Sequence, residues 1–570
     1  MTLENLANEL LLDLFEYFRA VEVLRSFYGL NSRLNELISK HFLKHRLDFH
    51  RSPKKDFDLI CQVYLPEICE NILSIDLSDD DDIPGEIDLF LSYGWTLDRF
   101  ANLRSVTFTN IRYGENICDI LSQCQQIIHL NLTACYFGYS IRNIWNSIWA
   151  LPNLIYCFLS LVFKDDYYLS IPNQCSTSIK HLTIIGISFQ IGPLQAFCER
   201  TPQLEYLSVD LSPRSISESI QTPIESISKL NISIIDVQSN TIENLLQHTP
   251  NLIELKIDSC YPDLNGYEWE NLIRNYLPKL EQFQLKMKFQ MFNPNQRDQL
   301  LKSFQTPFWI KERQWFIQFH FNLDDKSNMI YLYTLPFSFT NFDLYFPLQI
   351  QTTYPNDDCY EQVQRLSYRC SLQTEEIITT NFQFSNVTHL NVTLPFNQNL
   401  ILLTEKLLQL TSLDVSKPKN MSSHHSFDQL QKLIDSTNCL ESLKFSSWSE
   451  SDMLTPIALR TREISRVHLR GYDHYFTDED CFRLSQSSLG KSCRILFIKV
   501  QTRSNIIELI NSLPNLQSLI CQSKDDYWQF NITAMKDPFI QWLNENLNKH
   551  NCSIKRDLRY KHSIRIWIDI

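Results

Sequence analysis

One recurring pattern restricts the fold of this chain more than any other feature. A helix-like segment ends in proline, and a strand-like run of the form apolar-x-x-apolar-x-apolar follows. Five copies are nearly identical where the strand-like run begins: Pro152-Asn-Leu154, Pro202-Gln-Leu204, Pro250-Asn-Leu252, Pro278-Lys-Leu280 and Pro514-Asn-Leu516. Each proline stands where it would stop the preceding helix. The pattern therefore predicts helices and strands in alternation.

The strand-like runs recur at steps of 23 to 31 residues within two series. They begin at Ile72, Leu103, Ile127, Leu154, Ile179, Leu204, Ile227, Leu252 and Leu280, and again at Val387, Leu410, Leu440, Ile464, Cys493 and Leu516. A unit of about 25 residues cannot cover the apolar faces of its own strand and helix, so the next unit must cover them. An ordinary parallel α/β sheet also alternates strands and helices, but its period would be less regular.

Two copies of the pattern are longer. Leu252-x-x-Leu255-x-Ile257-x-x-Cys260 and Ile127-x-x-Leu130-x-Leu132-x-x-Cys135 resemble the repeat of leucine-rich-repeat proteins, Leu-x-x-Leu-x-Leu-x-x-Asn/Cys. This resemblance implies an α/β fold, a horseshoe-shaped solenoid with a parallel concave sheet and outer helices. Residues 71–290 and 363–523 are expected to form the repeats.

The first forty residues predict short helices with wide apolar faces. Apolar residues at 10, 11, 14, 15 and 18 have helical spacing, and Asn8 is placed to cap this helix. A second group at 23, 24, 27, 30 and 34 repeats the spacing. So short a segment cannot bury this much apolar surface by itself, which implies a partner surface.

The same segment resembles the F-box. The resemblance rests on Leu6, Glu9-Leu10-Leu11, Leu14-Phe15, Phe18, Glu22-Val23-Leu24, Phe27, Leu30-Asn31 and Arg33-Leu34, whereas the family usually has Pro in place of Ala7 and often Trp in place of Leu34. It implies that residues 1–45 dock on a Skp-type adaptor and, through it, on a cullin ubiquitin ligase. The helical core and the adaptor contact would be formed by Leu6, Leu10, Leu11, Leu14, Phe15, Leu24 and Leu30. The alternative is an amphipathic helical cap on the end of the solenoid.

Three further segments complete the expected organisation. Residues 46–70 are expected to be a helical linker, and residues 524–570 a C-terminal cap on the last repeat. Residues 291–362 form an irregular aromatic segment in which Trp315, Ile317, Phe319 and Phe321 alternate with polar and aromatic residues. This period of two, followed by a polar turn over 322–328 and the run 330–334, predicts a hairpin that either extends the sheet or interrupts the solenoid.

Composition limits the classes of partner that we expect for the chain and the cellular compartment in which we expect it. The net charge of −13 and the absence of a Lys/Arg stripe disfavour nucleic acid as a partner. No apolar run reaches the length of a signal peptide or a membrane span, so no membrane is expected and the cytoplasm or nucleus is predicted. The 16 cysteines are scattered singly and are expected to be free thiols.

Motifs for catalysis are lacking in the sequence. No phosphate-binding glycine loop or nucleophile elbow occurs, and no Cys/His spacing suits zinc, so neither a cofactor nor a metal nor an enzymatic activity is expected. The acidic run Asp79–Asp82 is expected to be a solvated loop, and His41 and His45, beside Lys44 and Arg46, a solvent-facing pair. An enzyme hidden in the aromatic segment would need a deep polar pocket there.

These observations predict a substrate-recognition subunit of a cullin-type ubiquitin ligase. The N-terminal helices would hold the adaptor, and the concave sheet would hold an unknown protein substrate. Strand positions that flank buried apolar residues should line this face, among them His129, Asn131, His181, Thr183, Tyr206, Ser208, Glu254, Lys256, Gln282, Gln284, His389, Asn391, Arg466 and His468. The alternative function is a protein-interaction scaffold that recruits no ligase and whose N-terminal helices only cap the solenoid.

Overall fold

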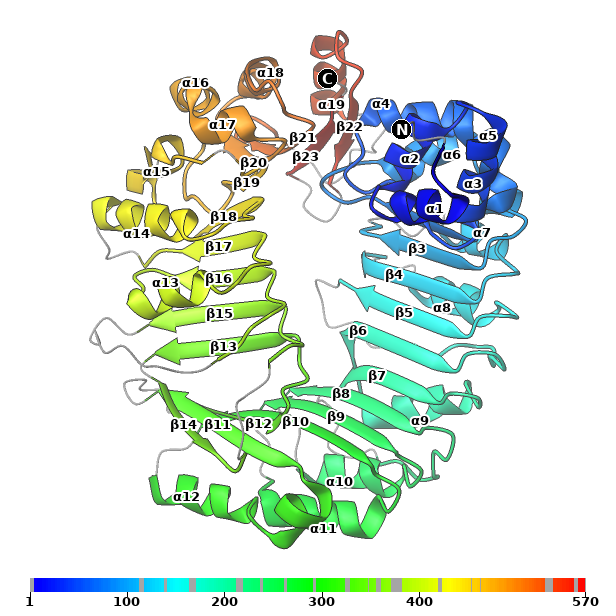
Figure 1. The fold of residues 1–570 in the computed structure, drawn as a ribbon, viewed down its shortest axis with the longest axis vertical. Helices are drawn as coiled ribbons and strands as arrows, with labels where there is room; N and C mark the ends of the chain where they lie inside the picture. Colours follow the sequence, from blue (N-terminus) through cyan, green and yellow to red (C-terminus); the bar gives the residue numbers. More distant parts are fainter. Residues whose placement is uncertain are drawn as a thin grey trace.

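The computed structural model is an α/β protein in which two large, mainly parallel sheets follow one another around an arc, with helices along the outer side (Figure 1). It describes residues 5–568 except 112–116, 138–140, 163–170, 212–218, 236–238, 261–263, 291–293, 323–328, 347, 355–359, 371–381, 419–422, 453, 462, 528–536 and 558–561. The α/β class is thereby confirmed. Within these ranges, no helix is both long enough and apolar enough to cross a membrane.

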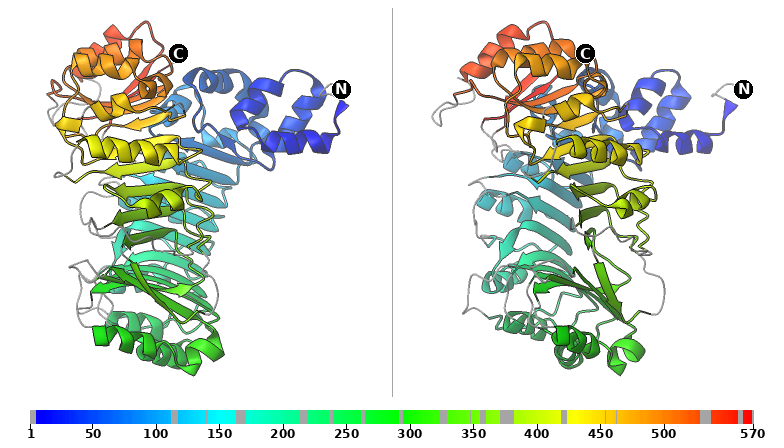
Figure 2. Two further views of the ribbon diagram at one scale, coloured as in Figure 1. Left: turned by 60° about the vertical axis from the view of Figure 1, so that its left-hand side comes forward. Right: turned by 90° about the vertical axis from the view of Figure 1, so that its left-hand side faces the viewer.

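Short helices form the N-terminal end of the arc and project from it (Figure 2). The elements are α1 (Asn8–Glu16), α2 (Ala20–Phe27), α3 (Ser32–Phe42), β1 (Leu47–Asp48), α4 (Lys54–Leu59) and α5 (Leu65–Ile68). Leu11, Phe15 and Leu24 are fully buried, in a core that is continuous with that of the first sheet. The helices therefore cover one end of this sheet.

Two expectations for this end are wrong. Asn8 does not cap α1, because it is the first helical residue and its Oδ1 accepts a hydrogen bond from Arg33 Nε at 2.8 Å. His41 is not solvent-facing, because it follows Leu34 and Ile38 along the buried side of α3. It stacks on His45 with ring centroids 4.2 Å apart, and burial lowers the pKa of His41 to about 4.

The first sheet runs in chain order. After β1 come parallel strands β2 (Ser74–Ser78), β3 (Ser105–Thr109), β4 (His129–Cys135), β5 (Tyr156–Leu161), β6 (His181–Phe189), β7 (Tyr206–Leu211), β8 (Lys229–Ile235), β9 (Glu254–Cys260) and β10 (Gln282–Gln290). Each strand from β2 to β10 begins two residues after a predicted start. The associated helices are α6 (Glu86–Ser92), α7 (Ile117–Ser122), α8 (Ile141–Trp149), α9 (Ile191–Glu199), α10 (Ser239–Gln247), α11 (Gly266–Tyr276) and α12 (Pro294–Ser303).

An antiparallel group ends the first sheet. The predicted hairpin is confirmed as β11 (Phe316–Asn322) and β12 (Met329–Leu335), and its turn lies outside the described residues. β12 pairs with β10, and β11 pairs with β14 (Leu348–Thr352). The hairpin therefore extends the sheet and also ends its parallel order.

The second sheet resumes the parallel order earlier than expected. It begins at β13 (Asn341–Phe346), inside the segment predicted to be irregular, and continues with β15 (Arg365–Cys370), β16 (His389–Thr393), β17 (Ser412–Ser416), β18 (Ser442–Ser446), β19 (Arg466–His468), β20 (Ile495–Val500) and β21 (Ser518–Ser523). Its helices are α13 (Gln398–Thr404), α14 (Ser423–Asp435), α15 (Leu454–Ala458), α16 (Asp478–Gln486), α17 (Ser488–Ser492) and α18 (Arg503–Ser512). α19 (Pro538–Asn546) and the hairpin of β22 (Ser553–Arg556) and β23 (Ile564–Trp567) follow, and β23 pairs with β21.

Alternation along the strands decides which side chains face inward. In β9, Leu255 and Ile257 are buried, whereas Glu254, Lys256 and Asp258 are partly exposed. Figure 1 shows the helices along the outer side of the sheets. Buried strand residues pack against helix residues, as Phe283 of β10 does against Trp269 of α11, so the other, more polar side of the strands lines the interior of the arc. Strands β8, β9 and β10 pair in register without a shift, so their inward side chains form continuous rows across this part of the sheet.

The two ends of the arc touch. Trp567 of β23 is buried and packs against Phe57 of α4, with ring centroids 5.6 Å apart. Arg565 Nη1 donates to Asp79 Oδ1 at 3.1 Å, and Ser518 Oγ donates to the carbonyl of Asp81 at 2.6 Å. This contact between residues 47–88 and 441–567 is called the junction below.

The junction overturns the expectation of a solvated acidic loop. Asp82 is 4% exposed and pairs with Arg466, while Arg51 Nε lies 3.7 Å from its Oδ2. Asp79 pairs with Arg565. Arg466 and Arg565, from the other end of the chain, pair with the carboxylates of Asp82 and Asp79. The sequence around the acidic run does not reveal such distant partners.

Candidate functional site

Four aromatic rings stand in a row on the inner face of the first sheet. His129, Tyr156, His181 and Tyr206 occupy matching register positions on β4 to β7. Successive ring centroids are 4.4, 4.5 and 6.1 Å apart, with interplanar angles of 6°, 11° and 32°. Strands in a sheet lie about 4.8 Å apart, so rings in register stack face to face. These four residues are called the aromatic row.

A cavity of about 590 Å³ lies over the aromatic row. Asn131 and Thr183 line it from the next row of inward side chains. Lys229 and Glu254 continue the first row, and Lys229 Nζ lies 3.0 Å from Glu254 Oε2. The cavity thus has an aromatic part and a charged part.

Stacking determines what the aromatic row presents to a ligand. Because the ring faces cover one another, the ring edges point into the cavity, and these edges carry imidazole nitrogens and phenol hydroxyls. Partial burial lowers the pKa of His129, which favours its neutral form. A neutral imidazole both donates and accepts hydrogen bonds. The row therefore presents polar and aromatic groups to the cavity.

Six of the predicted substrate-binding residues line this one cavity: His129, Asn131, His181, Thr183, Tyr206 and Glu254. The sequence analysis did not name Tyr156 or Lys229 among them. Both stand at the same place in the repeat pattern as His129, two residues after Leu154 and Ile227. The repeat pattern was therefore sufficient to place Tyr156 and Lys229 in the same row as His129.

The remaining predicted substrate-binding residues lie elsewhere. Gln284 is farther along the first sheet on β10, and Asn391 is on β16 of the second sheet. Lys256 Nζ donates to the carbonyl of Ser338 at 2.6 Å, so an intramolecular contact already engages it. His468 stacks on a neighbouring ring, and burial lowers its pKa to about 3.

The seven residues assigned to the helical core and adaptor contact divide by exposure. Leu11, Phe15 and Leu24 are fully buried and therefore belong to the core. Leu10 and Leu30 are 54% and 64% exposed. Leu6 and Leu14 are half-buried.

Other apolar side chains of α1 to α3 and their ends are also uncovered. Tyr17 is 87% exposed, and Phe18 and Leu43 are 40% and 42% exposed. Together with Leu10 and Leu30 they are uncovered apolar side chains on a part of the molecule that projects from the arc (Figure 2). Uncovered apolar side chains that form a contiguous patch mark contacts with other proteins.

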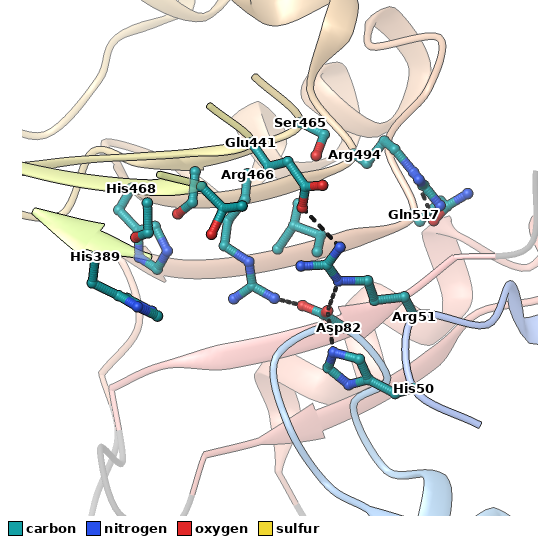
Figure 3. A pocket seen from close by; sticks show the side chains of 14 residues that line it. His50, Arg51, Asp82, His389, Glu441, Ser465, Arg466, His468, Arg494 and Gln517 are labelled. Carbon is teal, nitrogen blue, oxygen red and sulfur yellow. Dashed lines mark hydrogen bonds and ion pairs between the residues drawn. The ribbon is translucent and has the colours of Figure 1, made fainter. Parts of the chain in front are cut away.

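A second cavity, of about 350 Å³, lies at the junction (Figure 3). His50, Arg51 and Asp82 line it from the N-terminal end, and Arg466 and Arg494 line it from the second sheet. Among the described residues, one group places three metal-ligating atoms within 4.8 Å of one another, namely His50, Asp80 and Asp82. The arginines beside Asp82 already supply positive charge, which opposes a cation there.

No protein-family model matches the chain, and no curated protein matches its sequence.

Proposed function

We propose that the chain is a substrate-recognition subunit of a cullin-type ubiquitin ligase. In this proposal α1 to α3 form an F-box that binds a Skp-type adaptor, and the two sheets form a leucine-rich-repeat-like solenoid. The observation that carries it is the uncovered apolar surface at Leu10, Tyr17 and Leu30, on the helices whose sequence resembles the F-box. Burying such side chains contributes roughly 1.5–3 kcal/mol each, enough for a few of them to sustain a protein contact.

The aromatic row would hold the protein substrate. Aromatic side chains are enriched where proteins bind one another, because they give large contact areas at low entropic cost. The chain would catalyse nothing itself and would act by holding the substrate near the ubiquitin-transferring subunit.

The experiment is capture of purified Skp-type adaptor, and then cullin, by the full chain and by single variants. Leu10→Glu and Leu30→Glu place a charge in the apolar surface and are expected to weaken capture at least tenfold. Leu408→Glu is the matched control, because Leu408 is 70% exposed and lies after α13, far along the chain. No capture by the folded wild-type chain, or equal loss with Leu408→Glu, would contradict the proposal.

The second candidate function is an interaction scaffold without a ligase. It is favoured by the continuous core that joins Leu11, Phe15 and Leu24 to the first sheet, since these helices do cover its end. Deletion of residues 1–45 would expose this core, so exposed-residue variants separate the two functions better than truncation does. A scaffold would bind no adaptor, and Leu10→Glu would then leave its interactions unchanged.

A further inference from the structure

The cavity at the junction is built from both ends of the chain. His50 and Arg51 precede α4, and Asp82 follows β2. Arg466 is the first residue of β19 in the second sheet, and Arg494 directly precedes β20 (Figure 3). Four hydroxyl side chains also line it: Thr411, Ser412, Ser442 and Ser465. A volume of about 350 Å³ is at the small end of ligand pockets, which span about 300–1,000 Å³. The cavity therefore has the size for a small molecule.

Positive charge exceeds negative charge in this cavity. Its lining holds three arginines, Arg51, Arg466 and Arg494, against two carboxylates, Asp82 and Glu441. Arg466 pairs with Asp82, and Arg51 Nη1 lies 2.8 Å from Glu441 Oε2. The third arginine, Arg494, forms an ion pair with neither of these carboxylates.

Arg494 has no carboxylate partner among the residues that the structure describes. Its Nε and Nη2 donate to Gln517 Oε1 at 3.2 and 2.8 Å, and Gln517 is neutral. Burial lowers the pKa of Arg494, the positive charges of Arg19 and Arg51 lower it further, and the carboxylate of Glu441 offsets only part of this effect. A half-buried guanidinium among other cations is stabilised by an anion.

His389 and His468 of the lining do not supply this charge at neutral pH. Burial lowers the pKa of His468 to about 3, and burial and the charge of Arg365 lower the pKa of His389. Neutral imidazoles and hydroxyls remain as hydrogen-bonding groups around the arginines. Guanidinium forks together with hydroxyl donors are the usual surroundings of a bound phosphate.

We infer that the junction cavity binds a small phosphate-bearing anion, with Arg494 as its main cationic contact and Arg51 and the surrounding hydroxyls as further donors. Because the cavity walls come from both ends of the arc, the bound anion also stabilises the contact between these ends. The inference is independent of the proposed function, since the cavity includes neither the exposed side chains of α1 to α3 nor the aromatic row.

Calorimetric titration of the full chain with pyrophosphate and with inorganic phosphate tests this site. The ionic strength is kept constant with sodium chloride, because exposed charges are screened by salt. The expected result is binding of one anion per chain and a thermal midpoint that rises with its concentration. Absence of binding by either anion, or weak binding without saturation and without a thermal shift, overturns the inference.

Substitutions of Arg494 test whether this arginine is the main contact of the bound anion. Arg494→Gln is expected to weaken binding at least tenfold, and Arg494→Lys less, because lysine keeps the charge but loses the fork. Arg483→Gln is the matched control, since Arg483 is a half-exposed arginine of α16 paired with Glu479. Without added anion, Arg494→Gln should keep the wild-type thermal midpoint, because Arg494 bonds only within its own sheet. Equal anion affinity in Arg494→Gln and wild type contradicts the assignment, and Arg494→Lys provides the same test if Arg494→Gln does not fold.

Discussion

Gly186 fixes the backbone of β6 beside the aromatic row. Its φ is +87°, and the pairing of β6 with β7 shifts register between Ile184 and Ser188. Its N–H donates to Asp210 Oδ2 at 2.9 Å. A Cβ on this residue would lie 1.9 Å from the carbonyl oxygen of Leu161. Only glycine satisfies both the positive φ and this close approach.

Gly186→Ala is therefore expected to lower the free energy of unfolding by about 3 kcal/mol, the sum of the left-handed backbone cost and of overpacking. Urea unfolding followed by circular dichroism measures it. Gly94→Ala is the control, because Gly94 has a φ of +78° but nothing within 4 Å of an added Cβ. It should lose only about 1 kcal/mol. Equal losses would show that the contact with Leu161 has no energetic weight.

Among the secondary-structure elements, the strands were the most predictable from sequence. Each predicted start is followed by a strand, because a buried pair of apolar residues with a polar residue between them needs an extended backbone. β13 was missed although Phe339-x-x-Phe342-x-Leu344 has the same pattern, with phenylalanine in place of leucine. Six residues that line the cavity over the aromatic row were predictable for the same reason, since register brings equivalent positions together.

The N-terminal helices offer a test on two adjacent residues of α1. Leu11 is fully buried and Leu10 is 54% exposed. Leu11→Ala should lower the free energy of unfolding by about 2–5 kcal/mol, because it opens a cavity in the core. Leu10→Ala should change it by less than about 0.5 kcal/mol and yet weaken adaptor capture.

Thermal melting and adaptor capture of both variants separate the two roles of α1. If Leu10→Ala destabilised the chain as much as Leu11→Ala, the exposed surface would belong to the fold. Unchanged adaptor capture by Leu10→Ala would remove this leucine from the proposed contact.

At the scale of the whole molecule, the junction is the feature that sequence reasoning could not reach. Asp79 and Arg565 are separated by almost the entire chain, and neither has a local pattern that names the other. The acidic run was consequently assigned to solvent, and the arginines of the junction cavity were not recognised as a group. Each strand and helix unit adds a small rotation to the arc, and the total rotation over many units brings the two ends together. A short stretch of sequence contains no information on this total rotation.

Arg565 tests whether the ends depend on this ionic contact. Its side chain is 2% exposed and faces Asp79 and Asp81. Arg565→Gln leaves these carboxylates without their cation, which costs several kcal/mol if the junction stays closed. If the two ends of the arc separate, water hydrates the carboxylates and this cost is avoided. We therefore expect Arg565→Gln to have a larger radius of gyration in small-angle X-ray scattering and an unchanged circular dichroism spectrum. Arg483→Gln, which removes an exposed ion pair, should change neither. An unchanged radius of gyration in Arg565→Gln, with an unchanged thermal midpoint, would mean that the other contacts of the junction, such as that of Trp567 with Phe57 and the pair of Arg466 with Asp82, hold the ends without Arg565.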